Sequence, residues 1–154
     1  MTGEINIRDD GPMIVATVLL STCTTDRALT AFTDPKLVTR WWRGDLKAQP
    51  AEGGPYTIDF PAIPAQLTGQ VLAIRRGRFE FTWSWDNETP DSTVLITTEP
   101  GPEPESVLMT VKHGPHDDDD AVGRAAHQEH WEGWEYFLPR LVAELRAQDG
   151  GMPP

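Results

Sequence analysis

Apolar and polar residues alternate most regularly between residues 79 and 86. Phe79, Phe81, Trp83 and Trp85 fall on one face, and Glu80, Thr82, Ser84 and Asp86 fall on the other. A period of two is typical of a β-strand, because successive side chains point to opposite faces of the sheet. One apolar and one polar face indicate an antiparallel sheet with one side packed and the other in water.

Other segments extend this prediction to a sheet of about seven strands. Met13–Leu20 is apolar throughout and rich in β-forming residues, which predicts a largely buried first strand. Between residues 45 and 113 the period of two recurs, with apolar sets at 56–60 and at 107–113. About six further strands are therefore expected in this region.

Helical spacing occurs before and after the strand-rich region. Two short helices are expected after the first strand, one over residues 27–32 and one beginning at Asp34-Pro35. A long amphipathic helix is predicted over residues 122–147, with an acidic cap within Asp117 to Asp120. The predicted fold is α+β: a helix-grip domain over residues 12–147, in which a curved antiparallel sheet wraps around the C-terminal helix. Residues 1–11 and 148–154 are expected to be flexible tails.

Charge and composition exclude some classes of binding partner. The 154 residues include 13 basic and 24 acidic side chains, a net charge of −11. Such a chain repels phosphates, so neither nucleic acid nor an anionic membrane surface is an expected partner. No apolar run is long enough to insert into a membrane. The single Cys23 and the polar N-terminus predict a cytoplasmic protein without an internal disulfide.

Several strings resemble one protein family when they are read in order along the chain. They are Ala31-Phe32-Thr33-Asp34-Pro35 leading to Trp41-Trp42, Gly53-Gly54-Pro55-Tyr56, Gly69-Gln70-Val71-Leu72-Ala73-Ile74, Phe79-Glu80-Phe81-Thr82-Trp83 and His130-Trp131-Glu132-Gly133-Trp134. Together they resemble the START-like (SRPBCC) superfamily. The branch with the greatest similarity is named after the C-terminal domain of the activator of the ninety-kilodalton heat-shock protein ATPase.

This resemblance implies a seven-stranded sheet, a C-terminal helix and an apolar cavity between them. Members of the superfamily bind lipids, sterols, polyketides or other hydrophobic molecules, and a few relatives catalyse cyclisation. The co-chaperone activity is not carried over, because it depends on a separate N-terminal domain that we do not expect in a chain of this length.

Aromatic and histidine side chains are the candidates for a ligand site. The six tryptophans form three pairs along the sequence, and their indoles offer apolar area together with an N–H donor. An alternative is that these rings only fill the core. The predicted ligand-binding residues are Trp41, Trp42, Phe60, Phe81, Trp83, Trp85, His113, His130 and Trp134.

Metal and catalytic chemistry have weaker support. His127 and His130 have helical spacing for a metal pair, whereas His113 and His116 flank Gly114-Pro115 and are expected to diverge. His113, expected on an apolar face, is either a polar contact in the cavity or a core histidine bonded to a backbone carbonyl. Glu129, His130, His113 and Asp59 are the only candidates for acid–base catalysis. We therefore expect no metal, no cofactor and no catalytic residue.

Binding of a hydrophobic small molecule between the sheet and the C-terminal helix is the function that these patterns favour. Two alternatives stay open: a cavity enzyme of the polyketide cyclase or hydrolase type, and a co-chaperone-like module whose groove binds protein. Homodimerisation is common in small domains, and the sequence leaves it open.

Overall fold

The computed structural model describes residues 4–63, 65–85 and 92–150. These residues form the strands and helices β1 (Glu4–Asp10), β2 (Met13–Leu20), α1 (Thr25–Thr33), α2 (Pro35–Trp41), β3 (Asp45–Ala48), β4 (Pro55–Phe60), β5 (Ala65–Arg75), β6 (Arg78–Trp85), β7 (Ser92–Pro100), β8 (Val107–Gly114) and α3 (Ala121–Gly150). The turn predicted over residues 86–91 lies outside the described residues. No helix in the described part of the chain is long and apolar enough to cross a bilayer.

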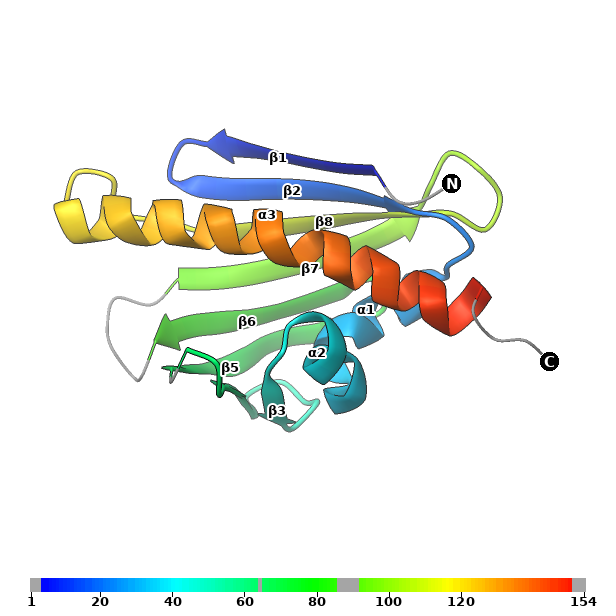
Figure 1. The fold of residues 1–154 in the computed structure, drawn as a ribbon, viewed down its shortest axis with the longest axis horizontal. Coiled ribbons are helices and arrows are strands. Elements are labelled where there is room, and N and C mark those ends of the chain that lie inside the picture. Colours follow the sequence, from blue (N-terminus) through cyan, green and yellow to red (C-terminus); the bar gives the residue numbers. More distant parts are fainter. Residues whose placement is uncertain (1–3, 64, 86–91, 151–154) are drawn as a thin grey trace.

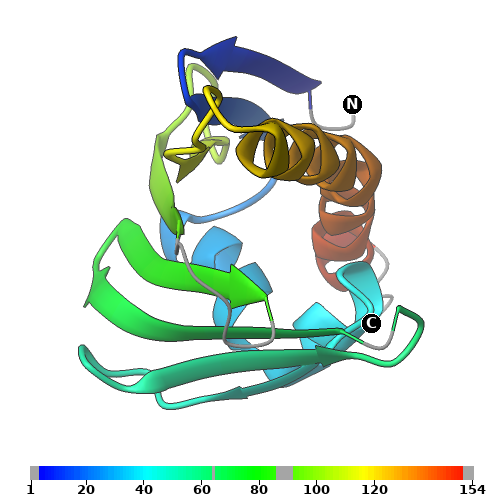
Figure 2. The ribbon, with the colours of Figure 1, turned by 90° about the vertical axis from the view of Figure 1, so that its left-hand side faces the viewer.

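The strands form one antiparallel sheet in the order β1-β2-β8-β7-β6-β5-β4-β3. Figure 1 shows α3 running along one face of this sheet, with α1 and α2 beside its C-terminal half. The end-on view in Figure 2 shows the sheet curving around the side on which the helices lie. The predicted α+β helix-grip architecture, with two short helices and one long helix, is confirmed.

The N-terminal segment corrects one prediction, because residues 4–10 form an edge strand rather than a flexible tail. β1 pairs with β2 in antiparallel register, with Arg8 opposite Val15. The segment is mostly polar because an edge strand needs apolar side chains on only one side. Here Ile5 and Ile7 are the side chains that pack against the core. This strand raises the number in the described sheet to eight, one more than expected.

The long helix begins where its acidic cap was predicted and ends later than expected. The backbone N–H groups of Val122 and Gly123 donate to the Asp120 carboxylate at 3.1 and 3.3 Å. A carboxylate in this place satisfies donors that the first turn leaves without partners and suits the positive end of the helix. The helix continues to Gly150, so residues 148–150 belong to it rather than to the predicted tail.

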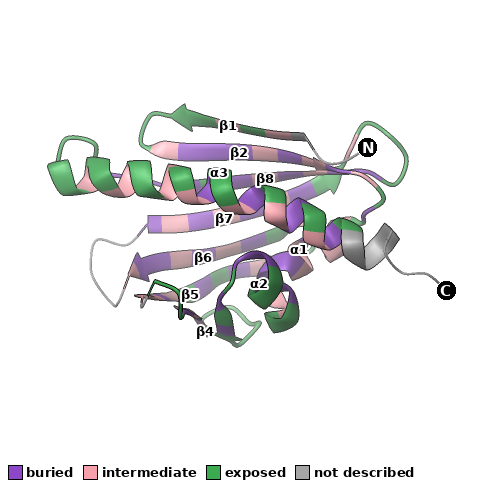
Figure 3. Ribbon diagram, viewed as in Figure 1, coloured by how far each residue is buried: buried purple, intermediate pink, exposed green. Residues whose placement is uncertain are grey.

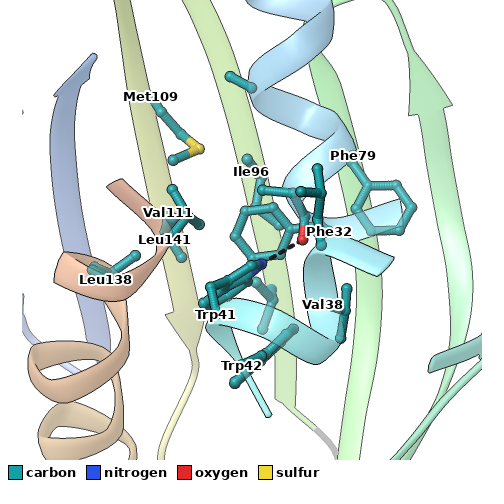
Figure 4. Close-up of a cluster of buried hydrophobic side chains, with 14 of the residues drawn as sticks. Phe32, Val38, Trp41, Trp42, Phe79, Ile96, Met109, Val111, Leu138 and Leu141 are labelled. Atoms are coloured by element: carbon teal, nitrogen blue, oxygen red, sulfur yellow. Dashed lines mark hydrogen bonds between the residues drawn. The ribbon is translucent and has the colours of Figure 1, made fainter. Parts of the chain in front are cut away.

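The core lies between the concave sheet face and the helices. Figure 3 shows buried segments alternating along the strands, while the outer side of α3 is exposed. In Figure 4, Phe32, Trp41 and Trp42 from α1 and the end of α2 meet Leu138 and Leu141 from α3. The Trp41 indole N–H donates to the carbonyl of Ala31 at 2.6 Å, so this ring is held by a hydrogen bond as well as by packing.

A second buried hydrogen bond joins the sheet to α1. The Tyr56 hydroxyl donates to the carbonyl of Phe32, and the Tyr56 side chain is fully buried. Its ring packs on Phe81 with a centroid distance of 4.2 Å and on Phe79 at 5.5 Å. Burial raises the pKa of Tyr56 far above the usual range, so the hydroxyl stays protonated and keeps donating.

Replacing Tyr56 by Phe tests this link. The variant Tyr56→Phe keeps the ring contacts but leaves the Phe32 carbonyl without its partner in the core. We expect the free energy of unfolding to fall by about 1–3 kcal/mol, measured by urea denaturation.

The matched control is Tyr136→Phe. The Tyr136 side chain is 55% exposed, and its hydroxyl accepts a hydrogen bond from Arg140 in a solvated position. Its loss should change the free energy of unfolding by less than about 0.5 kcal/mol. Equal losses in the two variants would show that the buried link contributes nothing of its own.

Candidate functional site

A cavity of about 300 Å³ lies between α3, the segment after α2 and the concave side of β4 and β6. Its wall is mainly aromatic, with a few polar side chains from α3 and from the segment that follows Trp42. The lining residues are Trp42, Arg43, Phe60, Ala62, Ile63, Trp83, Trp85, Glu129, His130, Gly133, Trp134, Tyr136 and Phe137.

Regular periodicities bring this wall together. Trp83 and Trp85 are two residues apart on β6 and therefore share its inner face. His130, Trp134 and Phe137 are spaced by four and three residues on α3, so they form one stripe opposite that strand. The strand and the helix thus contribute two facing walls.

The structure distributes the nine predicted site residues between the cavity and the core behind it. Six of them line the cavity: Trp42, Phe60, Trp83, Trp85, His130 and Trp134. Trp41, Phe81 and His113 do not. The Trp41 ring packs under Trp42 at 4.7 Å, and Phe81 packs against Tyr56. His113 is fully buried, and the centroid of its ring lies 4.6 Å from that of the Trp83 ring.

Seven lining residues were absent from the prediction. Phe137 lies on the apolar stripe of the helix, so the periodicity could have found it. Gly133 has no such signal, because a glycine reveals nothing of a cavity in front of it. Glu129 was considered only as a candidate for acid–base catalysis, since an exposed acid on a helix does not indicate a binding wall. The others, Arg43, Ala62, Ile63 and Tyr136, reach the cavity through loop paths and rim positions that only the tertiary structure defines.

His130, in the cavity lining, and His116, behind it, are joined by hydrogen bonds of defined direction. The indole N–H of Trp85 donates to Nε2 of His130 at 3.0 Å. An indole nitrogen is only a donor, so this Nε2 carries no proton and the proton of neutral His130 is on Nδ1. His130 Nδ1 then donates to Nε2 of His116 at 2.9 Å, and His116 Nδ1 donates to the carbonyl of Pro12 at 3.0 Å.

The same reasoning assigns the proton of His113. Trp134 donates its indole N–H to Nδ1 of His113 at 3.0 Å, so Nε2 holds the proton and donates to the Ser92 hydroxyl at 2.9 Å. A histidine that donates to a serine cannot remove the serine's proton. The buried Ser92–His113 pair is therefore not arranged as a nucleophile and its base. His113 is thus a core histidine and not a contact in the cavity. Its hydrogen-bond partners are the side chains of Trp134 and Ser92, where a backbone carbonyl was expected.

These rings also correct the expectation that His113 and His116 diverge. Their ring centroids are 5.2 Å apart, because the chain turns at Gly114, whose φ of 155° favours glycine. One nitrogen from each of His113, His116 and His130 lies within 4.8 Å of the others, a spacing that could hold a metal ion. Both nitrogens of each ring are already in hydrogen bonds, however. An ion would have to displace the indole donors of Trp85 or Trp134.

His127 is not part of the group of three histidines whose nitrogens converge, and its ring bridges two acidic residues. Nδ1 contacts Asp118 at 2.8 Å and Nε2 contacts Asp9 at 2.7 Å, so the charged ring ties α3 to β1. It does not share a metal face with His130, contrary to the i, i+3 spacing. Its ring instead stacks on His116 with a centroid distance of 4.6 Å.

Burial and position divide the histidines into two charge states. Desolvation, with smaller contributions from neighbouring histidines, lowers the pKa of His113 well below its usual value and the pKa of His130 to about 3. Desolvation likewise lowers the pKa of His116. Partial burial opposes the charged form of His127, but hydrogen bonds to Asp118 and Asp9 outweigh it and raise the pKa. Near neutral pH the three inner rings are therefore neutral.

Comparison with known proteins identifies the family. Residues 23–146 match the family described as "Activator of Hsp90 ATPase homolog 1-like protein". The chain belongs to this family. The match confirms the START-like resemblance seen in the sequence. No curated protein is similar enough in sequence to count as a relative.

Several solved structures share this fold. DynU16, from the dynemicin biosynthetic locus, is 25% identical with a TM-score of 0.72 over 94% of this chain, which spans about half (49%) of DynU16. CalU16 from Micromonospora echinospora is 19% identical, with a TM-score of 0.68 over 100% of this chain and 88% of CalU16. PFC0360w, an HSP90 activator from Plasmodium falciparum, is 17% identical, with a TM-score of 0.69 over 93% of this chain and 99% of that one. The last two show a shared fold.

Because the three inner histidines are neutral in the folded protein, we predict that acid lowers the free energy of unfolding. Unfolded histidines titrate near pH 6.5, whereas His113, His116 and His130 bind protons in the folded state only at lower pH. The neutral histidines therefore do not lower the stability of the folded protein above pH 6.5. As the pH falls from 6.5 toward their folded pKa values, protons bind preferentially to the unfolded chain, and the folded state loses stability. We expect the free energy of unfolding to fall between pH 6.5 and 5 by up to about 1.4 kcal/mol per pH unit for each inner histidine, measured by urea denaturation.

Two variants test which histidines cause this pH dependence of the free energy of unfolding. His130→Gln can still accept from Trp85 and donate to His116, and it should reduce the slope by the contribution of one histidine. His127→Gln should change the slope little, because His127, with its raised pKa, is protonated both folded and unfolded below pH 6. A free energy of unfolding that stays constant between pH 6.5 and 5 would contradict the neutral assignment.

Proposed function

We propose that this protein binds a hydrophobic small molecule with an aromatic body in the cavity between the sheet and α3. The observation that carries the proposal is the cavity itself, about 300 Å³ of space that an unusually large set of aromatic rings surrounds without filling. The cavity is open to solvent at its rim, where Ile63 and Tyr136 are 57% and 55% exposed, so its apolar wall meets water. A bound apolar ligand would remove that wall from water.

The arrangement of the rings supports a flat ligand. Trp42 lies 5.7 Å from both Trp83 and Trp134, and Phe60 lies 5.8 Å from Trp85, measured between ring centroids. Rings held against one another in this way cost little conformational entropy when a ligand stacks on them. We propose Trp42, Phe60, Trp83, Trp85, His130 and Trp134 as the ligand contacts.

Catalysis receives less support from the same geometry. His130 is the one inner histidine in the lining, and its two nitrogens are engaged by Trp85 and His116. A general base needs a free lone pair toward the substrate, and this ring does not offer one unless the Trp85 contact breaks. The proposal is therefore a binding function, in which the aromatic wall holds the ligand and the histidines hold the wall.

Filling the cavity from Gly133 tests the proposal. A Cβ added at Gly133 meets no heavy atom within 4 Å, and the residue faces the cavity. In Gly133→Leu the new side chain should occupy the ligand's space without a clash. Leucine also favours a helix over glycine, so the variant should be more stable by about 0.5–1 kcal/mol.

The expected result is a higher melting temperature with at least about tenfold weaker binding of planar aromatic ligands, followed by thermal shift and tryptophan fluorescence. Gly133→Ala is the matched control, since it gains helix stability but takes up little of the cavity. It should bind nearly as well as the wild type. Unchanged affinity in Gly133→Leu would place the ligand elsewhere, and a wild-type protein that binds no member of an aromatic and aliphatic panel would overturn the proposal.

A further inference from the structure

The hydrogen bonds that start at Trp85 form a chain with a donor-only group at one end and an acceptor-only group at the other. The Trp85 indole N–H donates to His130 Nε2 at 3.0 Å. His130 Nδ1 donates to His116 Nε2 at 2.9 Å, and His116 Nδ1 donates to the Pro12 carbonyl at 3.0 Å. An indole nitrogen only donates and a carbonyl oxygen only accepts, so the three bonds exist together in one direction only.

This chain has no place for an additional proton. A second proton on His116 lies on Nε2, which then donates to Nδ1 of His130. The single proton of His130 must move to its own Nε2, where it meets the indole N–H of Trp85. Two donors do not bond to each other, so the contact between Trp85 and His130 breaks. If His130 kept its proton on Nδ1 instead, the contact between the two histidines would break.

The surroundings decide which of the two contacts breaks. His116 is 7% exposed, so a charged N–H left without an acceptor there would carry the high cost of an unpaired buried charge. Trp85 is only partly buried, and it lines the cavity. Its indole can therefore turn into open space and donate to water. The weaker contact is the one between Trp85 and His130.

The groups around His116 make it the residue that takes up the proton. They are His113 on β8, His127 and His130 on α3, Asp9 on β1, Asp118 before α3 and the carbonyl of Pro12. Desolvation, together with the charged His127, lowers the pKa of His116, although the Pro12 carbonyl and the two carboxylates oppose this effect. The pKa of His130 falls to about 3, because desolvation and the neighbouring His116 and His127 all lower it.

We infer that His116 is a positioning residue for the cavity: it fixes the tautomer of His130 and so holds the Trp85 indole in the wall, and a proton on His116 releases that indole. Trp85 packs on Phe60 at 5.8 Å and on Trp83 at 5.3 Å between ring centroids, so its release opens this part of the wall. The effect on a ligand rests on the proposed function, whereas the release of Trp85 needs no ligand.

Nuclear magnetic resonance of the ligand-free protein tests the release directly. As the pH falls from about 7.5, the indole N–H resonance of Trp85, assigned with Trp85→Phe, should move upfield. In the same transition, which we expect below about pH 6.5, the proton of His130 should move from Nδ1 to Nε2. The Trp41 indole, which donates to Ala31, reports on folding and should not change in this transition.

Isothermal titration calorimetry with naphthalenemethanol, a planar compound without a group that titrates in this range, tests the effect on binding. The affinity should be constant above the Trp85 transition and should fall as the pH drops through it. One pH unit below the midpoint, binding should be about tenfold weaker, because only about one molecule in ten keeps the closed wall.

Three variants separate positioning from packing. His116→Gln can still accept from His130 but takes up no proton, so the neutral-pH affinity should be kept and the pH dependence of Trp85 should disappear. His116→Leu offers no acceptor and should bind the compound more weakly even at neutral pH. His127→Gln removes a ring that stacks on His116 outside the chain, and it should keep the Trp85 transition.

The outcomes distinguish this inference from the proposed function. A Trp85 resonance that changes only together with that of Trp41, or a transition that persists in His116→Gln, would overturn the inference. Unchanged affinity through the Trp85 transition would overturn it as well, while the proposed function stands. A Trp85 transition without binding of naphthalenemethanol or any other aromatic compound would support the role of His116 and overturn the proposed function.

Discussion

Because this curved sheet buries only one of its faces, that concave face governs how every helix packs. The strands place apolar residues on their concave face, and α3 is the long element in the described chain that lies across it. A single helix cannot fill a concave surface uniformly. It packs tightly where Leu138 and Leu141 meet α1 and α2, and leaves the cavity where Gly133 removes a side chain from its inner face.

Hydrogen bonds with a fixed direction then determine the chemistry around that cavity. Indole donors from Trp85 and Trp134 dictate which nitrogen of His130 and His113 carries the proton. The two imidazoles are thereby held neutral and without free lone pairs. Among the residues that the structure describes, the buried indole N–H of Trp83 has no hydrogen-bond partner. A histidine-rich wall that would otherwise indicate acid–base or metal chemistry thus becomes a rigid support for binding.

Periodicity predicted most of the fold because burial on one face leaves a direct trace in the sequence. The alternation in β6, the helical stripe of α3 and the Asp120 cap were all readable from neighbouring residues. β1 was missed because its paired edge buries only Ile5 and Ile7 within a polar segment. Family resemblance supplied the order of these elements, which periodicity alone does not determine.

The inner faces, and therefore six of the lining residues, could be read from the sequence, since a side chain's face follows from its local spacing. The depth of each residue depends instead on tertiary packing. It placed Trp41 and Phe81 in the core behind the wall and joined His113, His116 and His130 from two elements and a loop. Depth and convergence depend on how distant segments pack, and local spacing carries no record of that packing.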